Sequence, residues 1–188
     1  KHNALPLVGD ARVGLEALDA ALMGWQVDSE WTQKALKLKE EWLVDADAAR
    51  AASNVELPSD AQVIGAVQRG RTKATLVCAS GGLPGELHKL WRADGPGSYH
   101  LDYGFSTMGY EIAGGLGVAI ARPDDDIVVM VGDGSYLMMN SEIVSAVMMG
   151  IRLTVVVLDN AGFGCINRLQ MATGGANFNN LFRDTYHS

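Results

Sequence analysis

The stretch Ile-Val-Val-Met-Val-Gly-Asp-Gly-Ser at residues 127–135 joins an apolar run to a polar turn flanked by glycines. An unbroken apolar run rich in β-branched residues is typical of a strand buried on both faces, as in a parallel sheet. Two similar runs occupy residues 75–79 and 153–158. Segments 108–121 and 140–149 have helical spacing and lengths suited to crossover helices. The chain is therefore predicted to have an α/β fold, a parallel sheet flanked by helices.

The region before residue 59 reads differently from the rest. Residues 1–24 are predicted to be the tail of a preceding domain, with a helix that begins at Asp10. Residues 25–58 are predicted to be a helical linker, whose helix begins at Asp28 or Ser29 and runs to about Ala52. The α/β domain is expected to fill residues 59–188, beginning with a helix from Ser59 or Asp60 to about Gln68. Because the chain begins without a methionine and ends in a polar stretch, it is expected to be a fragment, truncated at its C-terminus.

The composition argues against nucleic acid and membranes as partners and against a disulfide framework. The net charge is −7 and the basic residues are scattered, so no basic stripe for nucleic acid is present and nucleic acid is not expected as a partner. No apolar run approaches the roughly 18 residues that span a bilayer. The protein is therefore expected to be soluble and cytoplasmic and not to associate with a membrane. Two cysteines are too few for a disulfide framework, and Cys78 and Cys165 are expected to be free thiols.

Glycine is concentrated where the predicted strands end. Three glycine-rich loops are predicted, at residues 80–85, 132–134 and 162–164. In open parallel sheets, ligands bind beyond the carboxyl ends of the strands, where glycine lets the backbone approach a ligand closely. The sequence therefore predicts a binding site at this edge of the sheet.

Asp133 and Asn160 are the candidate metal ligands. Each directly follows a predicted strand, so both side chains emerge at one sheet edge, on neighbouring loops if the two strands are adjacent. Carboxylate, amide and carbonyl oxygens suit a hard cation such as Mg²⁺, which completes its octahedron with phosphate oxygens. Taken separately, Asp-Gly and Asp-Asn are also ordinary turn sequences. Together they favour a clamp for a metal and a diphosphate.

Gly132-Asp133-Gly134 with Asn160 resembles the signature of thiamine-diphosphate enzymes, a family that includes acetolactate synthase, pyruvate oxidase and pyruvate decarboxylase. The resemblance implies thiamine diphosphate and Mg²⁺ as cofactors and residues 59–188 as the diphosphate- and metal-binding domain. It implies that the metal ligands are the side chains of Asp133 and Asn160 and the carbonyl of Gly162. The family often has two asparagines where this chain has Asp159-Asn160, a departure that leaves the ligand in place.

The segment Gly-Phe-Ser-Thr-Met-Gly at residues 104–109 also resembles the family. The resemblance implies that Met108 is the apolar wedge that bends the cofactor. It also implies that the carbonyl of Ser106 accepts a hydrogen bond from the cofactor's aminopyrimidine. The alternative interpretation is that Met108 simply fills the core. Residues 79–83 form a looser match. The full set of cofactor-binding residues so implied is Gly82, Leu83, Ser106, Met108, Gly132, Gly134, Ser135, Asn160 and Gly162.

Three longer stretches resemble one branch of the family, the trihydroxycyclohexane-1,2-dione hydrolases, which act in myo-inositol breakdown. They lie at residues 81–91, 108–115 and 162–170. This implies a small-molecule substrate, a cyclic polyol dione, whose ring opens by hydrolysis of a carbon–carbon bond. Two alternatives stay open. One is another thiamine-diphosphate enzyme, an acetolactate synthase-like carboligase or an oxidase, and the other is a non-catalytic anion-binding domain.

The resemblance assigns no catalytic side chain to this chain. It implies that the activating glutamate comes from the pyrimidine-binding domain of a second subunit, in a homodimer or homotetramer. This chain alone is then expected to lack turnover and to bind cofactor weakly. Cys165 is interpreted as a loop thiol. The remaining polar candidates for substrate contact, each interpreted rather as a surface residue, are His88, His100, His187, Glu86 and Arg168.

Overall fold

The computed structural model describes residues 4–182. They form two compact units, one up to Val44 and one from Asp45 onward. In the first unit, helix α1 (Ala11–Ala21) begins where the sequence predicts. The side chain of Asp10 accepts hydrogen bonds from backbone N–H groups of the first turn, which otherwise have no partner. This capping explains the start of the helix, which buries none of its residues.

Helix α2 (Ser29–Ala49) confirms the helix predicted from Asp28 or Ser29 and ends slightly before the predicted Ala52. Asp28 caps its start, where Oδ1 accepts a hydrogen bond from the backbone N–H of Glu30 at 2.8 Å. The last turn of α2 belongs to the second unit. None of the helices that the structure describes is long and apolar enough to cross a membrane.

Helix α3 (Asp60–Gly70) opens the α/β region with a capping box. The Oγ of Ser59 accepts a hydrogen bond from the backbone N–H of Gln62, and the Gln62 side chain accepts one from the Ser59 N–H. The predicted start at Ser59 or Asp60 is therefore confirmed, and the helix ends at Gly70 rather than Gln68.

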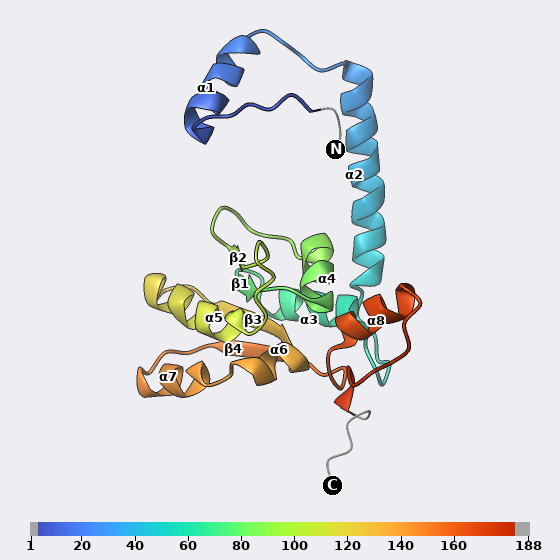
Figure 1. The fold of residues 1–188 in the computed structure, drawn as a ribbon, viewed down its shortest axis with the longest axis vertical. Helices are drawn as coiled ribbons and strands as arrows, with labels where there is room; N and C mark the ends of the chain where they lie inside the picture. The colour runs from blue at the N-terminus through green and yellow to red at the C-terminus, as the bar shows by residue number, and fades with distance from the viewer. Residues whose placement is uncertain (1–3, 183–188) are drawn as a thin grey trace. The chain divides into compact units, whose positions relative to one another are not determined.

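The sheet has four parallel strands in the order β2-β1-β3-β4 (Figure 1). The predicted parallel α/β fold is confirmed. Because β3 pairs with β4 and Gly132 lies opposite Leu158, the loops that carry Asp133 and Asn160 leave the sheet side by side. The strands are β1 (Thr75–Cys78), β2 (Tyr99–Leu101), β3 (Ile127–Gly132) and β4 (Thr154–Leu158).

Alternate residues of the central strands fill two separate cores, one on each face of the sheet. Leu76 and Val128 pack with α3 and α4 (Gly82–Leu90), whereas Val77 and Val129 pack against α5 (Tyr110–Ala121). All four side chains are fully buried. Burying each one stabilises the fold by about 1.5–3 kcal/mol, which explains why the strands read as continuous apolar runs. Helix α7 (Glu142–Met148) packs beside α5.

The three predicted glycine-rich loops are shorter than expected, because helices begin within them or directly after them. Helix α4 begins at Gly82, α6 (Asp133–Met138) begins at Asp133 itself, and α8 (Gly164–Ala172) begins at Gly164. Pro84 does not prevent α4, since the first turn of a helix needs no donor at that position. The correction places several predicted ligand-binding residues in the first turns of helices.

Candidate functional site

A cavity of about 250 Å³ lies beyond the carboxyl ends of β1, β3 and β4. Loops and first turns that follow these strands line it, together with the segment before α5 and residues of α8. The structure brings all nine predicted cofactor-binding residues to this one cavity. They are Gly82, Leu83, Ser106, Met108, Gly132, Gly134, Ser135, Asn160 and Gly162.

Asp133 lies in the chain between two residues that line this cavity, Gly132 and Gly134, and its carboxylate is incompletely satisfied. Its side chain is buried, and Oδ2 accepts a hydrogen bond from the backbone N–H of Gly162 at 2.7 Å. Its other oxygen, Oδ1, is shielded from solvent and has no hydrogen-bond partner among the described residues. A buried carboxylate oxygen without a partner is unfavourable unless a cation compensates it. The unpaired oxygen is therefore a candidate ligand for a metal ion.

The loop after β4 carries the other two predicted metal ligands, Asn160 and Gly162, and both line the cavity. A β-carbon at Gly134 would lie 3.1 Å from the carbonyl oxygen of Gly162, so this carbonyl lies close to the turn that follows Asp133. A β-carbon at Gly164 would lie 3.0 Å from Oδ1 of Asn160, so Gly164 makes room for that side chain. Within residues 4–182 no three His, Cys, Asp or Glu side chains cluster as metal ligands, so a metal site here would combine the Asp133 carboxylate with amide and backbone oxygens.

Residues 180–182 fix the shape of the loop that follows β4. This pairing was not predicted from the sequence. The Phe163 N–H donates to the carbonyl of Asn180 at 2.7 Å, and the Phe182 N–H donates to that of Ala161 at 2.8 Å. Gly162 forms an antiparallel bridge with Leu181 between them. Gly162 has φ +139° in this pairing, which excludes most other residues.

The segment before α5 brings Met108 and Ser106 to the cavity wall. Ser106 has φ +56°, an uncommon conformation for a residue with a side chain, and its Oγ donates to Oγ of Ser80 at 3.1 Å. Gly109, with φ +88°, then begins α5 as its N-cap. Met108 is half-buried and lines the cavity, as the wedge interpretation requires.

Glu111 is a buried acidic residue at the site that sequence analysis did not single out. It is 1% exposed in the first turn of α5, and both of its carboxylate oxygens lie 2.9 Å from Oγ of Ser135. Burial raises the pKa of Glu111, while hydrogen bonds from its own N–H, Ser135 and Gly109 act in the opposite direction. A glutamate at the start of an apolar helix was the available signal in the sequence.

The polar candidates for substrate contact are dispersed. His88 packs its ring against Tyr99 and Tyr103, and Tyr103 lines the cavity. Arg168 is exposed, but its guanidinium lies where a β-carbon of Gly82 would be. Three others lie away from the cavity lining or outside the described residues: Glu86 pairs with Lys89, His100 contacts the carbonyl of Gly97, and His187 lies beyond residue 182.

Both cysteines are free thiols, as predicted. Burial raises the pKa of Cys78 to about 11, an effect that its hydrogen bond with Tyr99 opposes, so this thiol stays protonated and unreactive at neutral pH. Cys165 is partly buried and lines the cavity from α8.

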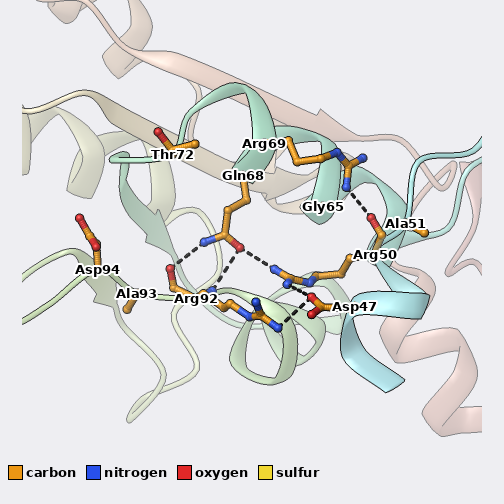
Figure 2. A pocket seen from close by; sticks show the side chains of 10 residues that line it. All are labelled: Asp47, Arg50, Ala51, Gly65, Gln68, Arg69, Thr72, Arg92, Ala93 and Asp94. Atoms are coloured by element: carbon orange, nitrogen blue, oxygen red, sulfur yellow. Dashed lines mark hydrogen bonds and ion pairs between the residues drawn. The ribbon is translucent and has the colours of Figure 1, made fainter. Parts of the chain in front are cut away.

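A second cavity, of about 430 Å³, lies between the end of α2, α3 and the end of α4, away from these residues (Figure 2). Although it is larger, its arginines are already paired. Asp47 binds Arg50 at 2.6 Å and Arg92 at 2.8 Å, Arg50 donates to Gln68 at 2.7 Å, and Arg69 donates to the carbonyl of Arg50. We interpret this network as a structural clamp that holds the last turn of α2 to α3.

The clamp leads to a prediction about acid sensitivity. Hydrogen bonds from Arg50 and Arg92 lower the pKa of Asp47 below its ordinary value of 3.8. The carboxylate therefore contributes stability above the unfolded-state pKa, and this contribution is lost as pH falls through the folded-state pKa. Asp47→Asn is expected to lower the thermal unfolding midpoint at neutral pH, and the difference from wild type should shrink as pH falls below about 3.8 and through the lower folded-state pKa of Asp47.

Asp45→Asn is the matched control, since Asp45 is exposed and makes no ion pair among the described residues. Thermal unfolding followed by circular dichroism measures both variants. An Asp45→Asn variant that loses as much stability as Asp47→Asn, or an Asp47→Asn deficit that is constant with pH, would contradict the clamp.

All the residues that line the cavity, apart from Asp60, lie in a segment that matches a known protein family. Residues 79–187 match the family described as thiamine pyrophosphate enzyme, C-terminal TPP binding domain. Proteins named 3D-(3,5/4)-trihydroxycyclohexane-1,2-dione hydrolase are similar to the chain: the one from Bacillus subtilis is 34% identical and the one from Halalkalibacterium halodurans 37%. Each alignment covers 97% of this chain and 32% of the relative, so the chain spans about a third of those proteins.

Among solved structures, a thiamine diphosphate-dependent 4-hydroxybenzoylformate decarboxylase from Rhodococcus jostii has a similar fold, with a TM-score of 0.63. The alignment covers 70% of this chain and 25% of the decarboxylase. At 21% sequence identity, this similarity concerns the fold alone.

Proposed function

Because the chain belongs to the thiamine pyrophosphate enzymes, we propose that the cavity at the ends of β1, β3 and β4 holds the diphosphate of thiamine diphosphate through a bound Mg²⁺. One observation carries the proposal: the buried Oδ1 of Asp133 has no hydrogen-bond partner within residues 4–182. The carbonyl of Gly162 approaches the same turn, and Asn160 lines the same cavity. Oxygen ligands of this kind suit Mg²⁺, which keeps its other positions for phosphate oxygens and water.

Other residues of the cavity would hold the rest of the cofactor. At the start of α4, the N–H groups of Gly82 and Leu83 have no partner within the helix and would donate to phosphate oxygens. In the segment before α5, Met108 would support the bent cofactor, and the Ser106 carbonyl would accept a hydrogen bond from its aminopyrimidine. These residues share one cavity with two of the candidate metal ligands, Asn160 and Gly162, which supports this assignment.

We propose that the reaction is hydrolysis of a carbon–carbon bond in a cyclic polyol dione. The names of relatives that are 34–37% identical to this chain support this substrate class. When bound, thiamine diphosphate supplies a nucleophilic carbon for a carbonyl and accepts the electron pair of the adjacent breaking bond. Water then adds across the broken bond, giving a carboxylic acid at one carbon and a hydrogen at the other. The chain's own residues bind and orient the reactive groups.

The remaining parts of the active site are proposed to lie outside this chain. The chain spans about a third of its relatives, and no acidic residue among those described lines the cavity where a cofactor ring would be activated, apart from Asp60 at its rim. We propose that a pyrimidine-binding domain of a second subunit supplies the activating glutamate, in a cytoplasmic homodimer or homotetramer.

Product analysis tests this function. The full-length protein, with Mg²⁺ and thiamine diphosphate, should convert the cyclic dione into an open-chain acid that carries one oxygen atom from isotope-labelled water. Mass spectrometry of the product gives the result. A product formed without water uptake would instead indicate a carboligase, and oxygen consumption would indicate an oxidase. The chain alone should show no turnover, and measurable hydrolysis by it would contradict the proposed role of the second subunit.

A further inference from the structure

Glu111 has no role in the proposed function, although it is costly to bury. The side chain is 1% exposed and follows directly on the segment that lines the cavity. No lysine, arginine or histidine among the described residues forms an ion pair with it. A buried carboxylate without a cation is retained only where hydrogen bonds compensate it.

Those hydrogen bonds form a closed triangle. Oε2 of Glu111 accepts from the Gly109 N–H at 3.0 Å, and both carboxylate oxygens lie 2.9 Å from the Ser135 hydroxyl. The Gly109 N–H also donates to Oγ of Ser135, at 2.7 Å. All three residues are buried. The triangle thus joins the start of α5 directly to the start of α6.

Two corners of the triangle, Gly109 and Ser135, adjoin different parts of the cavity. Gly109 directly follows Met108, which lines the cavity on the side proposed for the cofactor rings. Ser135 lines the cavity and lies two residues after Asp133, on the side proposed for the metal and diphosphate. The triangle is therefore placed to set the distance between these two sides.

The Ser135 hydroxyl has a single hydrogen, and this limits what it can do. With an ionised Glu111, that hydrogen is donated to the carboxylate, while Oγ accepts from Gly109. Ser135 then has no hydrogen to offer a phosphate. This argues that Ser135 acts in the site mainly as a link to Glu111 rather than as a donor to the diphosphate.

We propose that Glu111 is a positioning residue that holds the Met108 segment and the Asp133 segment at the separation required by thiamine diphosphate. The proposal rests on the proposed function. This role differs from that of a purely structural cap of α5. Loss of Glu111 should weaken the binding of a ligand that contacts both sides of the cavity more than the binding of a ligand that contacts only the metal side. Thiamine diphosphate is a ligand of the first kind, and inorganic diphosphate is one of the second.

The test compares the affinities of these two ligands in the full-length protein at saturating Mg²⁺, by isothermal titration calorimetry. Glu111→Ala should weaken thiamine diphosphate binding roughly tenfold, as expected for loss of charged hydrogen bonds, and inorganic diphosphate binding less than about threefold. Glu111→Gln should restore most of the affinity, because its amide oxygen can accept from Gly109 while its nitrogen donates to Ser135. If Glu111→Ala does not fold, Glu111→Asp replaces it, since its carboxylate is one methylene too short to reach Ser135.

Thr75→Val is the matched control. Thr75 is 2% exposed at the start of β1, and its hydroxyl donates to Oδ2 of Asp125 at 2.7 Å, away from the cavity lining. It should lose stability without changing either affinity. If the wild-type protein binds cofactor and Glu111→Ala weakens the binding of both ligands equally, or of neither, the inference is overturned. Failure of the wild-type protein to bind thiamine diphosphate with Mg²⁺ would overturn the proposed function itself, and the inference with it.

Discussion

Replacing Asp133 with asparagine is expected to weaken Mg²⁺-dependent binding of thiamine diphosphate by at least about a hundredfold, since outer-sphere changes alone cost 10–100-fold at metal sites. Asparagine has nearly the same shape as aspartate. Its amide oxygen can still accept the hydrogen bond that the Gly162 N–H donates to Oδ2 of Asp133 in the wild type. What disappears is the negative charge at the unpaired oxygen. Titration calorimetry with and without Mg²⁺ measures the effect.

The same substitution separates function from folding. Without metal, the buried Asp133 carboxylate is unfavourable because no cation compensates it, so the Asp133→Asn variant should unfold at a temperature equal to or above that of wild type. With Mg²⁺ and cofactor, only wild type should gain stability. Asp124→Asn is the control, since it removes the same charge from an exposed position without an ion pair among the described residues. Unchanged Mg²⁺-dependent binding in Asp133→Asn would exclude Asp133 as a ligand.

Gly162→Ala is expected to have the second large effect, by displacing the loop that carries two proposed ligands. A β-carbon there would lie 2.5 Å from the carbonyl oxygen of Asn180 and 2.9 Å from Cα of Leu181. Both are backbone atoms, so the loop must move, and φ +139° is unfavourable for alanine in any case. We expect a loss of about 3 kcal/mol in the free energy of unfolding, together with loss of metal-dependent cofactor binding.

Gly174→Ala is the control for this prediction. Gly174 also has a positive φ, +84°, but no atom lies within 4 Å of its hypothetical β-carbon. The control therefore introduces backbone strain without a steric clash, and should cost only about 1 kcal/mol and leave binding intact. Chemical denaturation and calorimetry measure the two effects. Equal losses in the two variants would show that strain alone, and not the contact with residues 180–182, determines the outcome.

The central strands and the positions of the candidate ligands were predictable because burial imposes a simple pattern. β1 and β3 are buried along nearly their whole length, so they read as apolar runs, and polar residues appear only where the chain leaves the sheet. β2 has three residues, none fully buried, and so lacked such a pattern. Helix α4 was hidden by Gly82, Pro84 and Gly85, and it forms because Leu83, Leu87 and Leu90 pack on the sheet.

The unpredicted parts of the site depend on contacts between residues that are distant in the sequence. Glu111 meets Ser135 only after α5 and α6 have packed at the same sheet edge. Asn180 meets Phe163 only after the chain returns from α8. Neither contact has a local pattern, so residue type and spacing gave no signal for them. Nearby features, such as the Ser59 capping box, were predictable because they involve residues three positions apart.

The backbone pairing of residues 180–182 with residues 161–163 also bears on where this polypeptide can be shortened for laboratory use. Helix α8 buries none of its residues, so by packing alone the region after β4 looks dispensable. Yet a chain cut before Asn180 would leave Phe163 and Gly162 without the neighbours that hold them in place. Trimming this end for crystallisation would therefore alter a site that lies at the other end of α8.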